Sequence, residues 1–222
     1  MISKKPEKTE KIILIDSNAL IHRAFHALPP FTARDGRPTG AVYGVALTLL
    51  SVIDKFQPEY VAATFDLKDP TFRHEKFAEY KATRVKAPDE LYAQIPLVKE
   101  MFKAWGIPVF EITGFEADDL IGTLCRKPEV DNIQSIIVTG DKDTLQLVDD
   151  NTAVFTLRKG IKDTVVYDAK AVEENFGYRP DQVVDFKALR GDASDNIPGV
   201  KGIGEKTTLD LIKKFVDRKS VV

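Results

Sequence analysis

The segment Ile12-Ile13-Leu14-Ile15-Asp16-Ser17-Asn18 decides the fold. Its run of apolar, mostly β-branched residues is typical of a strand that is buried on both faces of a parallel sheet. Asp16 ends the strand, and Ser17 or Asn18 is placed to cap a following helix. The segment therefore predicts a strand-to-helix junction with a carboxylate at the turn.

Two further segments repeat the order of an apolar run followed by an acid. Residues 60–65 end at Asp66, and residues 135–139 are followed by Gly140-Asp141. Apolar residues at helical spacing mark further segments: residues 40–55, 89–105 and 116–126. Alternating strands and helices predict an α/β fold, with a largely parallel central sheet and helices on both faces.

Shorter elements complete this expectation. Residues 107–110 predict a short strand, and residues 154–157 and 164–167 predict a hairpin across Arg158-Lys159-Gly160. From residue 169 the pattern is helical, apart from a Gly-rich turn near residue 202. The basic stretch at 68–88 is too long for an ordinary connection, which is typical of a functional loop.

The composition predicts a soluble globular protein. Of 222 residues, 43% are hydrophobic and 30% are charged, and no apolar run is long enough to cross a membrane. The polar N-terminus lacks the apolar core of a signal peptide, so we expect a cytoplasmic protein. The single cysteine excludes an internal disulfide and a multi-cysteine zinc site.

The net charge of −2 conceals a segregation of charge. Basic residues gather in two stretches: Arg73, Lys76, Lys81, Arg84 and Lys86 in the first, and Lys201, Lys206, Lys213 and Lys214 in the second. Acids fall elsewhere, often in pairs. This segregation suits a protein that holds phosphates on one surface and metal ions on another.

Three predicted strand ends each supply an aspartate: Asp16, Asp66 and Asp141. The carboxyl ends of parallel strands meet at one edge of a sheet, where ligands bind in open α/β folds. Six further acids lie elsewhere in the chain. Glu116, Asp118 and Asp119 are at the start of a predicted helix, Asp143 lies two residues beyond Asp141, and Asp192 and Asp195 precede the Gly-rich turn. Each acid alone could be a helix cap or could favour the positive end of a helix dipole.

Carboxylates gathered this closely repel one another, and a divalent cation compensates them most directly. Oxygen ligands without histidine or cysteine favour Mg²⁺ or Mn²⁺ over zinc. Two such ions about 3.5–4 Å apart can activate a water and stabilise the leaving oxygen of a phosphodiester. The acids therefore predict a metal-dependent phosphodiester hydrolase.

The segment Gly199-Val200-Lys201-Gly202-Ile203-Gly204-Glu205-Lys206-Thr207 is typical of a helix–hairpin–helix motif. Gly202 and Gly204 permit a tight turn and a close approach of the backbone to a phosphate. Backbone N–H groups at the next helix start can hold that phosphate, and Lys206 adds charge. An ordinary helix–helix turn with a surface lysine is the alternative. The motif predicts DNA binding without base recognition.

These motifs together resemble the flap endonuclease family, in the form of the 5′ nuclease domain of bacterial DNA polymerase I. The resemblance covers residues 11–215 and rests on an ordered set of segments: Leu14-Ile15-Asp16, Thr64-Phe65-Asp66, Phe72-Arg73-His74-Glu75, Tyr80-Lys81-Ala82-Thr83-Arg84, Glu116-Ala117-Asp118-Asp119, Thr139-Gly140-Asp141-Lys142-Asp143, the stretch from Gly191-Asp192 to Gly199, and Gly202-Ile203-Gly204-Glu205-Lys206-Thr207. It implies a PIN-like core, a helical arch and a helix–hairpin–helix motif.

The resemblance also implies roles for individual residues. One metal would be held by Asp16, Asp66, Glu116 and Asp118, and the second held or oriented by Asp119, Asp141, Asp143, Asp192 and Asp195. Lys81 and Arg84 would contact the scissile phosphate, with Tyr80 in the basic arch under which a single-stranded 5′ end threads, and Arg73 would bind phosphate nearby. Lys201, Gly202, Gly204, Lys206 and Thr207 would contact the duplex, and backbone carbonyls of this motif could bind K⁺.

We therefore expect a structure-specific 5′ nuclease that cleaves flapped or nicked DNA in primer removal and repair, with a polymerase domain possible in a longer parent protein. The expected parts are a disordered lead-in at 1–10, the nuclease core at 11–190 with its arch at 68–88, the hairpin motif at 191–216, and a tail at 217–222. The resembling domain continues beyond this chain's end. A common sequencing adapter encodes the last six residues, so we interpret them as a non-native tail.

Three alternatives have different chemistry. A DNA-binding module that is inactive because of truncation would bind DNA without cleaving it. A phospho-acceptor signalling domain of flavodoxin-like type also gathers acids at strand ends, but it explains neither nine acids nor the hairpin motif. A PIN-like RNA nuclease shares the acidic sheet edge, and the hairpin motif argues against it.

Overall fold

A six-stranded sheet forms the centre of the computed structural model, which describes residues 9–126, 133–157 and 163–215. The strand order is β3-β2-β1-β4-β5-β6, and only β6 runs antiparallel to its neighbour. The strands are β1 Glu10–Asp16, β2 Tyr60–Thr64, β3 Val109–Phe110, β4 Ile133–Thr139, β5 Thr152–Leu157 and β6 Thr164–Tyr167. The predicted, largely parallel sheet is confirmed.

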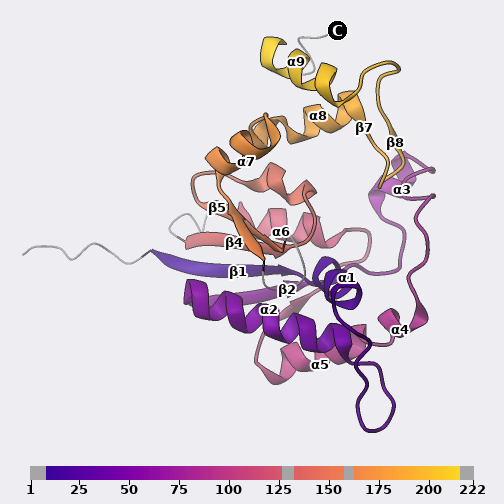
Figure 1. Ribbon diagram of the computed structural model, residues 1–222, viewed down its shortest axis with the longest axis vertical. Helices are drawn as coiled ribbons and strands as arrows, with labels where there is room; N and C mark the ends of the chain where they lie inside the picture. Colours follow the sequence, from indigo (N-terminus) through magenta and orange to yellow (C-terminus); the bar gives the residue numbers. More distant parts are fainter. Residues whose placement is uncertain (1–8, 127–132, 158–162, 216–222) are drawn as a thin grey trace, which may run out of the picture.

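Helices cover both faces of this sheet (Figure 1). One face packs against α1 Ser17–Ala27, α2 Gly40–Phe56, α4 Asp89–Tyr92 and α5 Ile95–Ala104. The other packs against α6 Ala117–Cys125, the 3₁₀ turn Asp143–Leu147 and α7 Ala169–Phe176. In β1, Ile13 and Ile15 face the first group and Leu14 faces the second, as alternation along a strand requires.

The single helix predicted at 89–105 is two helices, α4 and α5, and the prediction was wrong in this detail. The buried Gln94 lies at the break. Its Oε1 accepts a hydrogen bond from the backbone N–H of Ala41 at 2.7 Å, in the first turn of α2. The break therefore satisfies an N–H group that a helix start leaves unpaired.

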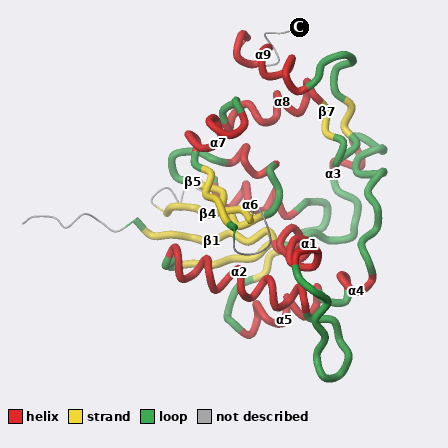
Figure 2. Tube along the Cα trace, viewed as in Figure 1, coloured by secondary structure: helices red, strands yellow, loops and turns green. Residues whose placement is uncertain are grey.

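The predicted arch at 68–88 contains one short helix, α3 Phe72–Lys76, and is otherwise turn and loop (Figure 2). The expected helical arch is therefore not helical beyond α3. Lys81 has a left-handed φ of 57°, and its N–H donates to the carbonyl of Asp195 at 3.0 Å. The side chain of Asn196 donates to the carbonyl of Glu79 at 2.8 Å. These bonds hold the basic segment against the loop that carries Asp195.

That loop joins α8 Val183–Arg190 to α9 Glu205–Phe215 and contains a two-stranded pair, β7 Gly191–Asp192 and β8 Ile197–Pro198. Gly191 has φ +86°, and a Cβ on Gly199 would lie 2.3 Å from the backbone of Arg190. Only glycine fits such a crossing of two backbone segments. The glycines thereby close the loop that places Asp192 and Asp195 beside the sheet.

The remaining predictions are resolved in part. The hairpin of β5 and β6 is confirmed, while its turn at Arg158-Lys159-Gly160, most of the predicted lead-in and the predicted tail lie outside the described residues. Glu10, placed in the lead-in, begins β1. Within the described segments, no helix has the length and apolar character that crossing a membrane requires.

Candidate metal and nucleic-acid site

Five acids line one pocket of about 230 Å³ at the carboxyl edge of the sheet: Asp16, Asp66, Glu116, Asp118 and Asp141. Asp16 is the last residue of β1, and Asp66 and Asp141 each lie two residues beyond a neighbouring strand. Glu116 and Asp118 lie at the start of α6. Parallel pairing of β1 with β2 and β4 is thus what brings the acids together.

Asp16 is buried and doubly hydrogen-bonded. Its Oδ1 accepts from the N–H of Ala19 at 3.1 Å and caps α1, a role that the sequence had suggested for Ser17 or Asn18. Its Oδ2 accepts from the hydroxyl of Thr139 at 2.6 Å. Burial nevertheless raises the pKa of Asp16 to about 6.

The pKa of Asp118 is raised further than that of Asp16. Burial raises its pKa to about 8, and the neighbouring charges of Asp16, Asp141 and Asp66 add to the shift. We call Asp16, Asp66, Asp118 and Asp141 the uncompensated acids, because none of them is ion-paired with a lysine or arginine of the described segments. Such a group is the arrangement that a divalent cation stabilises.

The other five acids are compensated by side chains of the protein. Lys81 Nζ lies 2.7 Å from Glu116 Oε1, and Arg84 lies 2.8 Å from Asp195. Lys187 pairs with both Asp143 and Asp192. The fifth pair joins Arg73 to Asp119. The acids therefore divide into a set without a cationic partner and a set with one.

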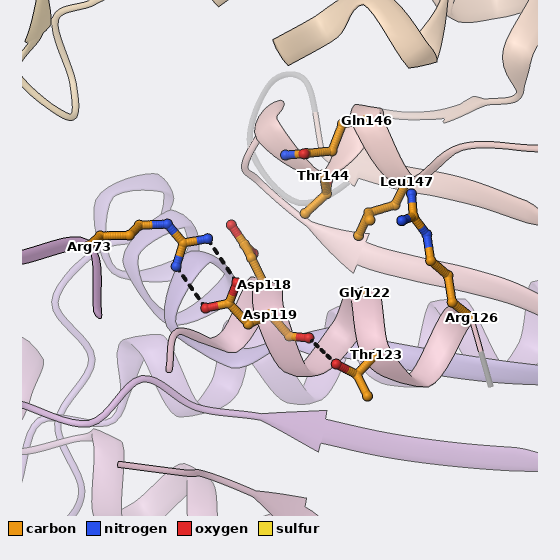
Figure 3. Close-up of a pocket in the computed structure, with 9 residues that line it drawn as sticks. All are labelled: Arg73, Asp118, Asp119, Gly122, Thr123, Arg126, Thr144, Gln146 and Leu147. Carbon is orange, nitrogen blue, oxygen red and sulfur yellow. Dashed lines mark hydrogen bonds and ion pairs between the residues drawn. The ribbon is translucent and has the colours of Figure 1, made fainter. Parts of the chain in front are cut away.

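Asp119 is fully engaged by Arg73 (Figure 3). Its two oxygens accept from the guanidinium at 2.7 and 2.8 Å, and one also accepts from the N–H of Glu116 at 2.9 Å. After burial, which raises it, the Arg73 hydrogen bond is the main influence on the Asp119 pKa, and the net shift is downward. Asp119 thus positions Arg73 and α6 in this structure, and its expected role at the second metal stays a prediction.

Asp143, Asp192 and Asp195 can bring one oxygen each to within 4.8 Å of one another. Burial and the charge of Asp141 raise the pKa of Asp143 to about 6 despite its pairing with Lys187. Burial acts in the same direction on Asp192, but hydrogen bonds from Lys187 and Ser194 outweigh it and lower the pKa to about 2. The structure thus gathers three of the five residues expected at the second metal and places Asp141 with the first group.

The basic residues of the 68–88 segment face this acidic edge. Lys81 and Arg84 line the same pocket as the uncompensated acids. Tyr80, expected in the basic arch, is buried, and its hydroxyl lies 3.1 Å from a Glu116 oxygen and 3.0 Å from an Asp195 oxygen, either of which can accept its one proton. Tyr80 therefore supports the acids from within the protein.

The predicted hairpin motif lies on the surface next to α9. Lys201, Lys206 and Thr207 are exposed, and Gly202 has φ +85°, as the predicted tight turn requires. A Cβ on Gly204 would meet no atom within 4 Å, so no contact inside the chain demands glycine there. Phe186, Leu189 and Ile212 join α8 to α9 beneath the turn.

Sequence reasoning missed Lys187 and Thr139, and it assigned no role to His22. Lys187 bridges acids that lie 44 residues before it and five residues after it, a pairing that no local pattern reveals. Thr139 lies beside Asp16 because β4 pairs with β1. His22 lines the acidic pocket one helical turn beyond Asn18, and burial lowers its pKa.

The uncompensated acids predict a pH-dependent stability. Because the folded pKa values of Asp16 and Asp118 exceed 3.8, the folded protein retains protons that the unfolded chain has released, and stability falls as pH rises. The contribution of Asp16 is mostly lost by about pH 6.5, so Asp118 dominates above it: in EDTA we expect the melting temperature to fall by several degrees between about pH 6.5 and 9, and excess Mg²⁺ to reduce this fall. His22, with an opposite effect, titrates below this window. Melting by circular dichroism checks this, and a flat or rising profile in EDTA would contradict it.

Comparison with known sequences places the chain in a family. A model described as the N-terminal resolvase-like domain of 5′-3′ exonuclease matches residues 11–177, and one described as its C-terminal SAM fold matches residues 178–222. DNA polymerase I of Bacillus subtilis is 44% identical over 206 residues, which cover 93% of this chain and 23% of the relative. For DNA polymerase I of Pseudomonas aeruginosa the identity is 45% over 201 residues, or 90% and 22%.

Solved structures agree on the fold. The T5 5′-exonuclease with bound zinc superposes with a TM-score of 0.76 at 24% identity, covering 96% of this chain and 78% of that one. The bacteriophage T5 flap endonuclease in a complex with DNA and metal ions gives 0.76 at 22% identity, with the same coverage. The chain spans less than a quarter of the curated relatives' length. By sequence and by fold, the chain belongs to the 5′-3′ exonuclease family of nucleases.

Proposed function

We propose that the chain is a structure-specific 5′ nuclease that hydrolyses phosphodiesters near the 5′ end of flapped or nicked DNA with two divalent metal ions. The observation that carries this is the pocket where Lys81 and Arg84 face the uncompensated acids. The same pocket offers carboxylates that can hold cations and cationic side chains that can hold a phosphate. Primer removal and repair are the proposed setting, by similarity to DNA polymerase I.

The donor set fits a first divalent ion. Asp16, Asp66, Glu116 and Asp118 offer only oxygen ligands, which Mg²⁺ and Mn²⁺ prefer. Asp16 and Asp118 are buried acids with raised pKa values, and a bound cation would favour their charged forms. Asp141, which the resemblance assigns to the second ion, lines the same pocket and would contribute charge to the first ion as well.

A second ion is proposed at Asp143, Asp192 and Asp195, whose oxygens can converge within 4.8 Å. Two bound ions would activate a water and stabilise the leaving oxygen. Lys81 and Arg84 are proposed to hold the scissile phosphate, because cationic donors that face the metals can stabilise charge on the transferred group. Both must exchange their pairs with Glu116 and Asp195 for phosphate.

The DNA duplex is proposed to bind at the exposed hairpin motif, through Lys201, Gly202, Gly204, Lys206 and Thr207. Backbone N–H groups at the start of α9 can contact phosphate without reading bases. A K⁺ ion on the carbonyls of this turn is part of the proposal. The exposure of these residues and the turn at Gly202 support it.

Removal of metal tests the proposal. With Mg²⁺ we expect short products from a 5′-labelled flap substrate, and with EDTA we expect cleavage to fall to background. In a separate measurement with Ca²⁺ in place of Mg²⁺, we expect DNA binding to persist. Gel analysis of products and fluorescence anisotropy of binding measure the two effects. Binding without cleavage in Mg²⁺ would favour the alternative of a non-catalytic DNA-binding module. Equal cleavage in EDTA would refute the metal mechanism.

A further inference from the structure

Among the lysines and arginines of the described residues, Lys187 alone pairs with two of the three acids proposed for the second ion, Asp143 and Asp192. It lies on α8, outside the basic segment that supplies Arg73, Lys81 and Arg84. Its Nζ contacts Asp143, and it lies 2.5 Å from Asp192 Oδ2. The ammonium group therefore links carboxylates that come from two distant parts of the sequence.

This bridging is the task that the second divalent ion would perform. A cation among Asp143, Asp192 and Asp195 must bind oxygens from the loop after β4 and from the loop after α8. Lys187 already joins those two loops with a single charge. Arg84 pairs with the third acid, Asp195, but its side chain is half exposed, whereas that of Lys187 is 30% exposed.

We propose that Lys187 is a tethered cation that competes with the second divalent ion for Asp143 and Asp192. The bridge keeps the second site assembled before that ion binds, and Lys187 must withdraw when it does. Lys187 therefore makes the second ion bind more weakly than the first. This inference rests on the proposed two-metal function and adds to it a residue that sets the metal affinity.

The surroundings allow Lys187 to withdraw. A cavity of about 520 Å³ adjoins the site, and its lining includes Lys187, Tyr178, Asn175 and Glu205. Glu205, at the start of α9, lines this cavity with a carboxylate that is loosely paired with Arg190 at 3.5 Å and mostly exposed to solvent, so it can accept a second cation. A lysine side chain has enough rotatable bonds to exchange one carboxylate for another without repacking of the core.

Binding of Mn²⁺ to the DNA-free protein, measured by titration calorimetry and by electron paramagnetic resonance of free Mn²⁺, tests this inference. For Lys187→Met we expect the weaker site to bind about tenfold more tightly, which corresponds to about 1.4 kcal/mol. We also expect a larger rise in melting temperature on Mn²⁺ addition than in the unaltered protein, because the paired carboxylates lose their compensation in EDTA. If Lys187 were only a structural residue, Lys187→Met would lower the melting temperature in EDTA and the melting temperature with Mn²⁺ by the same amount.

Three variants complete the design. Lys187→Arg retains the charge and should stay near the unaltered affinity, while Lys187→Gln, a second neutral variant, should tighten binding as Lys187→Met does. Lys142→Met removes a charge from the same cavity lining, where Lys142 Nζ lies 5.2 Å from the Phe176 ring centroid, and should change the affinity less than twofold. This control separates the bridge from the general effect of charge.

The outcomes are distinct for the inference and for the proposed function. Unchanged or weaker Mn²⁺ binding at the second site in the neutral variants would overturn the inference, since Lys187 would then be a neutral bystander or a support for the metal. An equal effect of Lys142→Met would overturn it as well. If the unaltered protein binds no divalent ion, the proposed function fails first and the inference falls with it.

Discussion

Asp141→Asn is expected to lower the rate of flap cleavage by at least about a hundredfold while DNA binding is retained. Asp141 lines the acidic pocket and acts electrostatically on Asp16, Asp118 and Asp143, so its charge reaches both groups of acids. Loss of several kcal/mol of metal-centred stabilisation gives this factor at about 1.4 kcal/mol per tenfold. Single-turnover cleavage with Mg²⁺ measures the rate, and anisotropy with Ca²⁺ measures the binding.

The matched control is Asp150→Asn, which makes the same chemical change at an exposed turn residue away from the pocket. Its rate should stay within twofold of the unaltered protein. Asp141 Oδ1 also accepts from the N–H of Asp143 at 2.9 Å, and the asparagine carbonyl can keep this bond. A variant that folds but cleaves at the normal rate would remove Asp141 from the metal site.

The strand ends could be predicted because each depends on local pattern. A run of apolar residues predicts a buried strand, and parallel pairing then determines where Asp16, Asp66 and Asp141 meet. The observed register of β1 with β2 and β4 brings them to one edge. The acidic pocket was therefore predictable as soon as the sheet was.

The ionic partners of the acids could not be predicted in this way. Arg73 meets Asp119 across 46 residues, and Lys187 meets Asp143 across 44. These contacts depend on how loops fold back over the sheet edge, and the charge pattern alone indicated only that phosphates and metals would bind on separate surfaces. The division into uncompensated and compensated acids is thus a result of the structure.

The backbone conformation of the basic segment at 68–88 could not be predicted from the sequence either. The segment's resemblance to an arch predicted a helix, but hydrogen bonds to the loop at Asp195 and Asn196 hold residues 79–83 in turns. Lys81 adopts φ 57° there, a conformation that disfavours residues with a Cβ. Strain of this kind is found at functional sites, where the surroundings hold it in place. The left-handed backbone at Lys81 fixes the position from which its side chain reaches the acids.

Lys81→Ala is expected to lower turnover by about a hundredfold and to change DNA affinity less than threefold. Lys81 lines the acidic pocket, and its Nζ lies 2.7 Å from Glu116 Oε1 in the position where a phosphate would face the acids. Loss of one preorganised donor for transition-state charge costs about 10²–10³ in rate. Most ground-state binding would come from other phosphate contacts, including the hairpin motif, so affinity should change little.

Lys86→Ala is the control, because Lys86 belongs to the same basic segment but its side chain is 74% exposed and pairs with Asp89. In Lys81→Ala the alanine retains a Cβ, so the backbone strain at position 81 persists and the backbone there should not relax. Single-turnover rates and anisotropy separate the two effects, and Lys81→Arg should recover part of the rate since it restores the charge. Loss of affinity with an unchanged rate would instead make Lys81 a DNA-holding residue, and the scissile phosphate would then lie nearer to Arg84.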